Sequence, residues 1–258
     1  MYRFNTLAAV LLSALFCSQA MADARVQILY PGAELDEPPG QAVTLTGSPR
    51  LADALANVKM PAEIDWVGSR ISTPAADAAM QQLQQQVLKN LNDVMLTAER
   101  QHEPEQAYNA RLLLQMISRL HVAGRVAKQL DPDWVRIRAE LNPRLEGDYT
   151  LRLAVRQPVV YVIGLTNGAE SVALQPGLGA VDYLAERDWF MGAESRALYL
   201  CQPDGHIERL PAEYWSTLHR EPMPGATLFI GLDESQLPAQ YQRLNYQIAT
   251  LLAARIAS

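Results

Sequence analysis

The sequence predicts an α+β protein that consists of two small sheet domains, a helical hairpin and a C-terminal amphipathic helix. Short β-branched runs bounded by turn residues, such as Val159–Leu165, indicate strands. Apolar residues recur at three- and four-residue steps between residues 73 and 122 and again after residue 234, which indicates helices. With 258 residues, of which 49% are apolar and 19% charged, the chain is typical of a protein with a buried core.

The first 22 residues have the pattern of a cleaved secretory signal peptide. A single cation, Arg3, precedes an apolar run that is too short to span a membrane, and Ala20-Met21-Ala22 follows it. We expect the mature chain to begin near Asp23, in the periplasm of a Gram-negative bacterium, without a transmembrane segment. Cleavage changes the net charge from −6 to −7 and leaves Cys201 as the one cysteine, so no internal disulfide is expected. The acidic balance and the lack of a basic run argue against a nucleic-acid partner.

Two parts of the chain resemble each other. Asp65-Trp66 recurs 123 positions later as Asp188-Trp189, and Arg70 recurs 126 positions later as Arg196. A nearly constant offset is typical of two copies of one module, although chance matches of common residues remain an alternative.

Each copy contains short strands around one helix. The first copy has expected strands at 25–32, 42–47, 133–141 and 149–156, and an expected helix at 50–58. The second has strands at 159–165, 196–202, 206–211 and 226–232, with a strand, a turn and a short helix within 172–186. A hairpin, a helix and then more strands is the order of a β-grasp fold. We therefore predict a first β-grasp domain at 23–156 and a second at 157–233.

A helical hairpin is predicted within the first domain, at 73–122. Thr73 is suited to be a helix N-cap, because Pro74 follows at the first helical position, and Pro104 begins a second helix. The inward-facing positions are expected to be Met80, Leu83, Val87, Leu91, Val94, Ala110, Leu113, Met116, Ile117 and Leu120.

The last predicted helix, at 234–258, is amphipathic. Its apolar stripe consists of Leu237, Tyr241, Leu244, Ile248, Leu251 and Leu252. Such a stripe must be buried, either on its own domain, on a partner or at a membrane surface. Only Arg243 and Arg255 are cationic, which argues against attraction to anionic lipid. We expect these side chains to contact a partner protein or their own domain.

Several stretches resemble the GfcC-like capsule and exopolysaccharide biosynthesis proteins of Gram-negative bacteria. The matching stretches are 122–126 ("VAGRV"), 159–165, 175–184, 201–215, 221–232 and 244–256. The resemblance implies two β-grasp (SLBB-like) domains akin to those of the polysaccharide exporter Wza, with a helical hairpin inserted in the first. It also implies a role beside polysaccharide export without an established enzymatic activity. The arginine that the family places in a cleft would fall on Arg125, although Ala123 stands where threonine is more usual.

Cys201, Asp204 and His206 lie close together in "LCQPDGHIERL" and could be taken for a nucleophile, an orienting acid and a base. However, Pro203-Asp204-Gly205 is suited to a tight turn between two strands. The alternation in "ALYLC" favours a cysteine packed in the core rather than a catalytic one.

Metal-dependent and glycan-hydrolysing activities are the other enzymatic hypotheses. His102, His121, His206 and His219 have no metal-ligand spacing, so we expect neither a metal nor a cofactor. Paired carboxylates could hydrolyse a glycan, and the candidates are Asp131, Asp133, Glu208, Glu213 and Glu221. Solvated carboxylates in loops and at strand edges explain the same residues. Aromatic stacking on sugar rings is a minor possibility for Trp134, Trp189 and Trp215.

Arg125 is the best candidate for ligand binding. It follows Gly124 at the junction of a helix and a sheet, where its guanidinium could bind a glycan or an anion, or instead cap the helix. Arg111 and Arg119 are weaker candidates. The sequence thus predicts a periplasmic, non-enzymatic accessory protein that binds polysaccharide or a polysaccharide-export protein. The alternative is a periplasmic glycan-modifying hydrolase that uses paired carboxylates.

Overall fold

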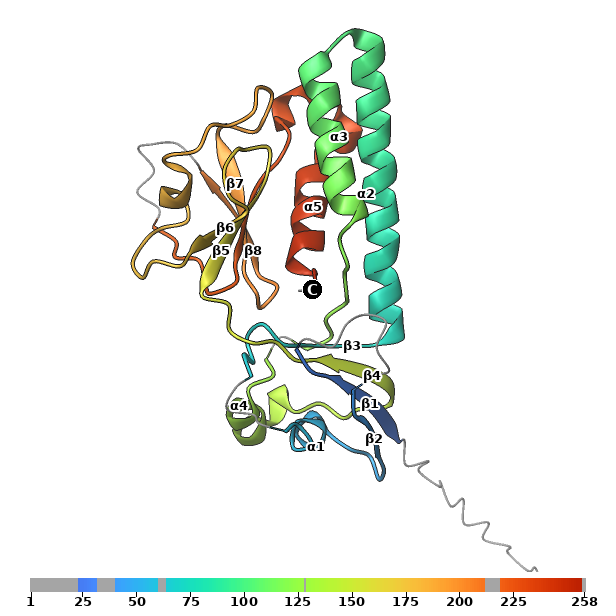
Figure 1. Cartoon of the computed structure of the whole chain (residues 1–258). Helices are drawn as coiled ribbons and strands as arrows, with labels where there is room; N and C mark the ends of the chain where they lie inside the picture. Colours follow the sequence, from blue (N-terminus) through green and yellow to red (C-terminus); the bar gives the residue numbers. More distant parts are fainter. Residues whose placement is uncertain (1–22, 32–39, 60–63, 128, 212–218, 257–258) are drawn as a thin grey trace, which may run out of the picture.

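The structure, a computed structural model, describes residues 23–31, 40–59, 64–127, 129–211 and 219–256. It contains a four-stranded sheet, a five-stranded sheet, a long helical hairpin and a C-terminal helix (Figure 1). The predicted signal peptide, Glu213 and Trp215 lie outside the described residues. The α+β class predicted from the sequence is confirmed.

The first sheet has the strand order β2-β1-β4-β3. Its strands are β1 (Ala24–Leu29), β2 (Ala42–Leu45), β3 (Arg70–Ser72) and β4 (Gly147–Arg152). β1 pairs with β2 in antiparallel and with β4 in parallel fashion, and β3 pairs with β4 in antiparallel fashion. The short helices α1 (Leu51–Leu55) and α4 (Pro132–Ile137) lie below it in the view of Figure 1. Val26, Ile28 and Leu151 belong to a core of its own that includes Leu51 and Val135 from these helices.

The prediction of a strand at 133–141 is wrong. These residues form most of α4 and a 3₁₀ turn, η2 (Ala139–Leu141). The Asp131 side chain accepts a hydrogen bond from the Asp133 N–H at 2.9 Å, and Pro132 occupies the first helical position. This N-terminal helix signal outweighs the β-branched character of Val135 and Ile137.

The second sheet has the order β6-β5-β9-β7-β8. Its strands are β5 (Val159–Gly164), β6 (Ser171–Ala173), β7 (Ala197–Cys201), β8 (Ile207–Pro211) and β9 (Thr227–Ile230). β5 and β9 are parallel, and each of the other pairs is antiparallel. A 3₁₀ turn, η3 (Asp182–Leu184), precedes β7. As in the first sheet, the first and last strands form a parallel pair, and the second strand lies antiparallel beside the first.

The predicted hairpin is present as α2 (Pro74–Gln101) and α3 (Pro104–Ser118). The Thr73 hydroxyl accepts a hydrogen bond from the Ala76 N–H at 3.2 Å, so Thr73 is the N-cap, as predicted. Val87, Leu91 and Leu113 are fully buried, but they join the core of the second sheet although the hairpin lies between β3 and β4 in the sequence. The hairpin therefore connects the two parts of the molecule.

The C-terminal segment is less helical than predicted. Two 3₁₀ turns, η4 (Glu234–Gln236) and η5 (Ala239–Tyr241), precede α5 (Leu244–Ala253). Pro238 lies between these turns, where its ring and missing N–H are incompatible with a continuous helix. Leu237 and Tyr241 consequently do not belong to an α-helix.

α5 lies between the second sheet and the hairpin (Figure 1) and packs on α2, β7, β8 and β9. The stripe residues Leu237, Leu244, Ile248, Leu251 and Leu252 are 4% exposed or less, and Tyr241 is half-buried. Of the three fates considered for this stripe, the structure shows docking on its own chain. The five leucine and isoleucine side chains of the stripe thus belong to the protein's own core, whereas Tyr241 is partly exposed.

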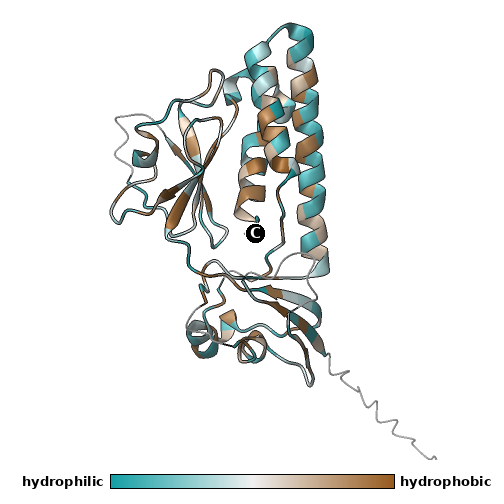
Figure 2. Cartoon of the chain, viewed as in Figure 1, coloured by the Kyte–Doolittle hydropathy of each residue, from teal (hydrophilic) through white to brown (hydrophobic). Residues whose placement is uncertain are grey.

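Hydropathy follows this layering. Apolar residues of α5 and of the inner hairpin face lie between the layers, and the outer hairpin face is hydrophilic (Figure 2). None of the described helices has both the length and the apolar character that crossing a membrane requires.

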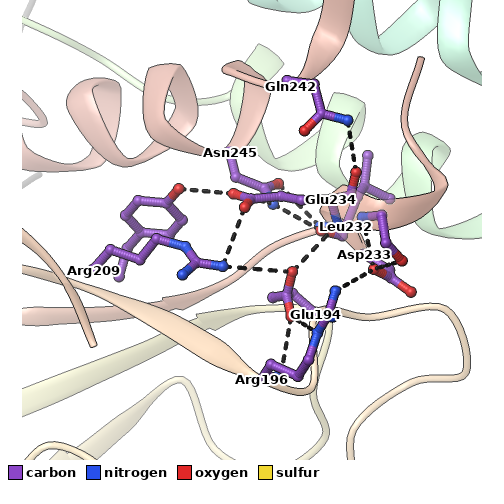
Figure 3. A network of polar contacts seen from close by, with 10 residues as sticks. Glu194, Arg196, Arg209, Leu232, Asp233, Glu234, Gln242 and Asn245 are labelled. Atoms are coloured by element: carbon purple, nitrogen blue, oxygen red, sulfur yellow. Dashed lines mark hydrogen bonds and ion pairs between the residues drawn. The ribbon is translucent and has the colours of Figure 1, made fainter. Parts of the chain in front are cut away.

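A polar network fixes the start of α5 to the second sheet (Figure 3). The buried Asn245 side chain accepts from the Leu232 N–H at 3.0 Å and donates to the Leu232 carbonyl at 2.7 Å. Gly231 permits this approach, since a Cβ there would lie 2.2 Å from Asn245 Oδ1. Glu234 accepts from the Tyr199 hydroxyl at 2.8 Å and pairs with Arg209 at 3.2 Å. The network serves as an anchor between α5 and its sheet.

Candidate anion-binding pocket

A pocket of about 240 Å³ lies where the two sheets, α5 and the segment connecting β4 to β5 meet. Arginines from three separate elements line it: Arg70 from β3, Arg152 from β4 and Arg255 from the residues after α5. The apolar part of its wall includes Leu153, Leu252 and Ile256. The single carboxylate among its lining residues is that of Asp65.

Arg70 is 7% exposed and donates its hydrogen bonds to backbone carbonyls. Its guanidinium bonds the carbonyl of Ala123 at 3.2 Å, that of Ala253 at 3.2 Å and that of Ala254. The last two carbonyls lie at the C-terminal end of α5, where a cation also interacts favourably with the helix dipole, and the Ala254 carbonyl accepts from the Ala123 N–H as well, at 2.9 Å. Arg70 thereby connects the first sheet to the last helix.

The charge of Arg70 is costly where it lies. Burial, and the neighbouring cations Arg125 and Arg152 after it, lower the pKa of Arg70 to about 9, and Asp77 offsets part of the effect. Within the described part of the chain, no carboxylate lies within ion-pair distance of Arg70. An anion in the pocket would relieve this repulsion.

Arg152 has its partners within the protein. It donates to the Ser72 hydroxyl at 2.7 Å and to Asp77 at 3.3 Å. Asp77, in the first turn of α2, also accepts from the Gly124 N–H at 2.7 Å. This arrangement holds the Arg152 guanidinium in place at the end of β4.

Arg255 has the most freedom to bind. Its guanidinium carbon lies 3.8 Å from the centre of the Tyr161 ring, a stacked cation–π arrangement. Among the described residues, no carboxylate lies within ion-pair distance of Arg255 and no backbone carbonyl accepts from it. Burial lowers its pKa, and Tyr161 opposes this effect. Stacking through the face of a guanidinium leaves the N–H groups at its edge available to a ligand.

Arg125, the arginine singled out from the sequence, acts as a brace next to the pocket. It donates to the Ser69 carbonyl at 3.0 Å and to the Pro203 carbonyl at 2.7 Å, which connects the start of β3 to the β7–β8 turn. Burial lowers its pKa, and Asp204 opposes this effect. It does not cap α3, which ends seven residues earlier at Ser118.

Gly124 explains the close approach of this segment to α2. A Cβ at Gly124 would lie 2.5 Å from the backbone of Ala76, so only glycine fits. The weaker candidates lie away from the pocket: Arg111 forms an exposed ion pair with Glu99 at 2.6 Å, and Arg119 is exposed at the end of α3.

The cysteine, aspartate and histidine do not form a catalytic group. Cys201 is 2% exposed, and its thiol donates to the Ala249 carbonyl at 3.4 Å, while burial raises its pKa to about 12. It pairs across the ladder with Ile207, and His206 is exposed. The Asp204 side chain accepts from the His206 N–H at 2.8 Å, which is the turn bond expected of an aspartate there.

The described candidate carboxylates are engaged in other contacts. Glu208 pairs with Arg220 at 3.0 Å, Glu221 lies 3.2 Å from a ring nitrogen of His219, and Asp131 caps α4. Asp133 is exposed on α4. Within the residues that the structure describes, no three His, Cys, Asp or Glu side chains gather as a metal site would require.

The remaining predicted residues are spread over the molecule. His102 and His121 are exposed, the former at the end of α2. Trp134 is 43% exposed beneath the guanidinium of Arg138, and Trp189 is half-buried. Neither tryptophan lines the pocket.

Sequence reasoning missed the three pocket arginines. The one sequence feature that marks Arg70 is its place in the repeated segment. This feature does not predict burial, because its counterpart Arg196 is 60% exposed and pairs with Glu194 and Asp233. Arg255 was noted only as a cation of the last helix. The distinction between buried and exposed arginines depends on contacts between distant elements.

Comparison with known proteins gives two matches to family models. Residues 22–156 match the N-terminal domain, and residues 168–257 the C-terminal domain, of the capsule biosynthesis protein GfcC. The uncharacterized protein YjbG of Escherichia coli (strain K12) is 33% identical over 252 residues, which cover 98% of each chain. The resemblance found in the sequence is confirmed: the chain belongs to the GfcC family of capsule biosynthesis proteins.

Proposed function

We propose that this chain is a periplasmic, non-enzymatic accessory protein of capsule or exopolysaccharide assembly and export, which binds an acidic polysaccharide. Membership of the GfcC family supports the process, and the N-terminal segment 1–22 supports the location. The observation that carries the binding role is the pocket itself, which brings three arginines and one carboxylate together in a partly apolar cavity. Concave sites with a few directed polar groups are typical of ligand binding.

We also propose that both sheets are β-grasp domains of the SLBB-like kind, at 23–156 and 157–233. Their shared arrangement supports this, because in each sheet the first and last strands form a parallel pair and the second strand lies antiparallel beside the first. The ligand would then bind at the junction of the two domains, where sites are common in proteins of several domains.

The alternative, a glycan hydrolase, finds little support in the placement of carboxylates. Glu194 and Glu234 are close together, but Arg209 lies between them at 3.9 and 3.2 Å, and Glu194 is 2% exposed. A general acid needs access to the substrate and a carboxyl group that can hold a proton. The burial of Glu194 denies it that access.

The test is binding of polysaccharide purified from cells that express the protein, measured by biolayer interferometry with the mature chain immobilised. We expect salt-sensitive binding that Arg255→Gln weakens and that the matched surface variant Arg111→Gln leaves unchanged. A parallel assay follows release of reducing ends from the same polysaccharide. Release of reducing ends would overturn the non-enzymatic role, and a lack of binding at low salt would overturn the binding role.

A further inference from the structure

The three pocket arginines differ in how far their guanidinium groups are already bonded to the protein. The Arg70 guanidinium is committed to three backbone carbonyls, and Arg152 to Ser72 and Asp77. Arg255 is stacked on Tyr161, and the described residues supply it with neither a carboxylate nor a backbone carbonyl. The direct contact with an anion therefore falls to Arg255, while Arg70 and Arg152 contribute their charge.

The size of the cavity limits the ligand. Pockets for drug-sized molecules usually measure about 300–1,000 Å³, so about 240 Å³ is suited to one sugar ring rather than several. Leu153, Leu252 and Ile256 offer apolar contact to the C–H groups of such a ring. The cavity is thus partly apolar, with its charge concentrated at the arginines.

The form of the anionic group follows from the number of available donors. One guanidinium edge presents two parallel N–H groups, which match the two oxygens of one carboxylate. A phosphate dianion is better served by several guanidinium groups, but Arg70 is already held by backbone carbonyls and Arg152 by Ser72 and Asp77. The Asp65 carboxylate in the wall also disfavours a doubly charged ligand.

We propose that the pocket takes a single uronic-acid-type sugar residue, at a chain end or on a side branch of the polysaccharide, with its carboxylate on the edge of the Arg255 guanidinium. This inference rests on the proposed function, because it names the part of the polysaccharide that the pocket binds. The pKa of Arg70, lowered by burial and then by Arg125 and Arg152, agrees with it, since a bound carboxylate would offset the repulsion between these cations. At Arg255 burial lowers the pKa, and a bound carboxylate would offset that loss of solvation.

The test uses defined small probes on the mature chain: methyl glucuronide, methyl glucoside, glucose 6-phosphate and inorganic phosphate. Binding is followed by titration with two-dimensional NMR at low salt. We expect methyl glucuronide to bind at least tenfold more tightly than methyl glucoside and more tightly than either phosphate. Shifted resonances should include those of Tyr161 and Leu252. Stronger binding of both phosphates would overturn the carboxylate assignment, and equal binding of the two methyl glycosides would overturn the role of charge.

Variants identify the contact residue. Arg255→Gln should weaken methyl glucuronide binding at least tenfold, Arg255→Lys should restore part of it, and Arg111→Gln should leave it unchanged. Comparison with the polysaccharide assay separates the two proposals. Binding of the whole polysaccharide without binding of methyl glucuronide would overturn the single-residue pocket and leave the proposed function standing. If neither binds while NMR shows a folded chain, both proposals fail.

Discussion

Arg70 in the first sheet donates a hydrogen bond to the carbonyl of Ala254, 184 positions later and directly after the last helix. This bond, with those to Ala123 and Ala253, connects the beginning and the end of the protein beside the pocket. A residue that appears in the sequence as one arginine among many is thus a central connection of the fold. The predictions below start from this connection.

Replacing Arg70 should destabilise the protein. Arg70→Met keeps much of the side-chain volume but removes the guanidinium donor of the Ala123, Ala253 and Ala254 carbonyls, of which Ala254 still accepts from the Ala123 N–H, at a cost of about 1–3 kcal/mol in the free energy of unfolding. Urea denaturation measures the change. The matched variant Arg111→Met, which removes an exposed ion pair, should cost less than about 1 kcal/mol. Equal effects of the two variants would contradict the anchoring role.

The Asn245 anchor should be equally sensitive. Asn245→Ala removes both partners of the buried Leu232 backbone and should lower the free energy of unfolding by about 2–4 kcal/mol. Gly231→Ala should have a comparable effect, because its Cβ would collide with the amide. Thermal unfolding provides the measurement. Gln240→Ala, at an exposed position nearby, is the control, and a similar loss of stability there would argue against a specific anchor.

Ligand affinity should fall in alkaline solution. The pKa of Arg70 is about 9 in the free protein, and a bound carboxylate would raise it, so the complex retains the proton more strongly. The affinity for methyl glucuronide should therefore decrease as the pH rises from 8 to 10. NMR titrations at several pH values measure it, and the amide spectrum confirms that the protein stays folded. A constant affinity over this range would show that the Arg70 charge does not contribute.

Cys201 should be inert in the folded protein. Its thiol is buried and its pKa is raised to about 12, so almost no thiolate exists at pH 8. In a mature chain beginning at Asp23 it is the single thiol, which makes Ellman's reagent a specific probe. We expect no reaction in buffer and one thiol per chain in 8 M urea. Rapid reaction in buffer, or loss of polysaccharide binding in Cys201→Ala, would reopen the question of a reactive cysteine.

Removing residues 244–258 should unfold part of the protein rather than only release a partner. Leu244, Ile248 and Leu251 fill the space between the hairpin and the second sheet, so their loss exposes both apolar faces. Increased binding of the dye ANS and a loss of cooperative thermal unfolding are the expected results. The control is Tyr246→Ser, which changes a 44% exposed side chain on α5 and should leave the cooperative unfolding intact. A truncated chain with native-like unfolding would contradict the core position of α5.

Local signals explain which parts of the fold were predictable. Pro74, Pro104 and the apolar period between them predicted the hairpin, and Pro203-Asp204-Gly205 predicted the β7–β8 turn. Asp131-Pro132 and Pro238 carry the same kind of signal, and there it outweighs the surrounding β-branched and apolar patterns. Helix termini are decided by caps and prolines as much as by hydrophobic period.

The candidate site was less predictable, for a physical reason. Arg70, Arg152 and Arg255 come together only because two sheets and the last helix meet at one junction. Arg125, which the sequence predicts as the ligand-binding arginine, lies next to this junction, but it donates to the Ser69 and Pro203 carbonyls and does not line the pocket. Whether an arginine stabilises the fold or binds a ligand depends on which hydrogen-bond acceptors surround it in the folded protein. No local sequence pattern specifies those acceptors.

The place of α5 also determines when the chain can become stable during its synthesis. The hairpin ends at Ser118, and the helix that covers its apolar face begins at Leu244, 126 positions later. Until those residues have emerged, Val87, Leu91 and Leu113 lack their final neighbours, and exposed apolar surface of this kind promotes aggregation. A nascent or prematurely terminated chain that lacks α5 therefore exposes apolar hairpin surface that the folded protein buries.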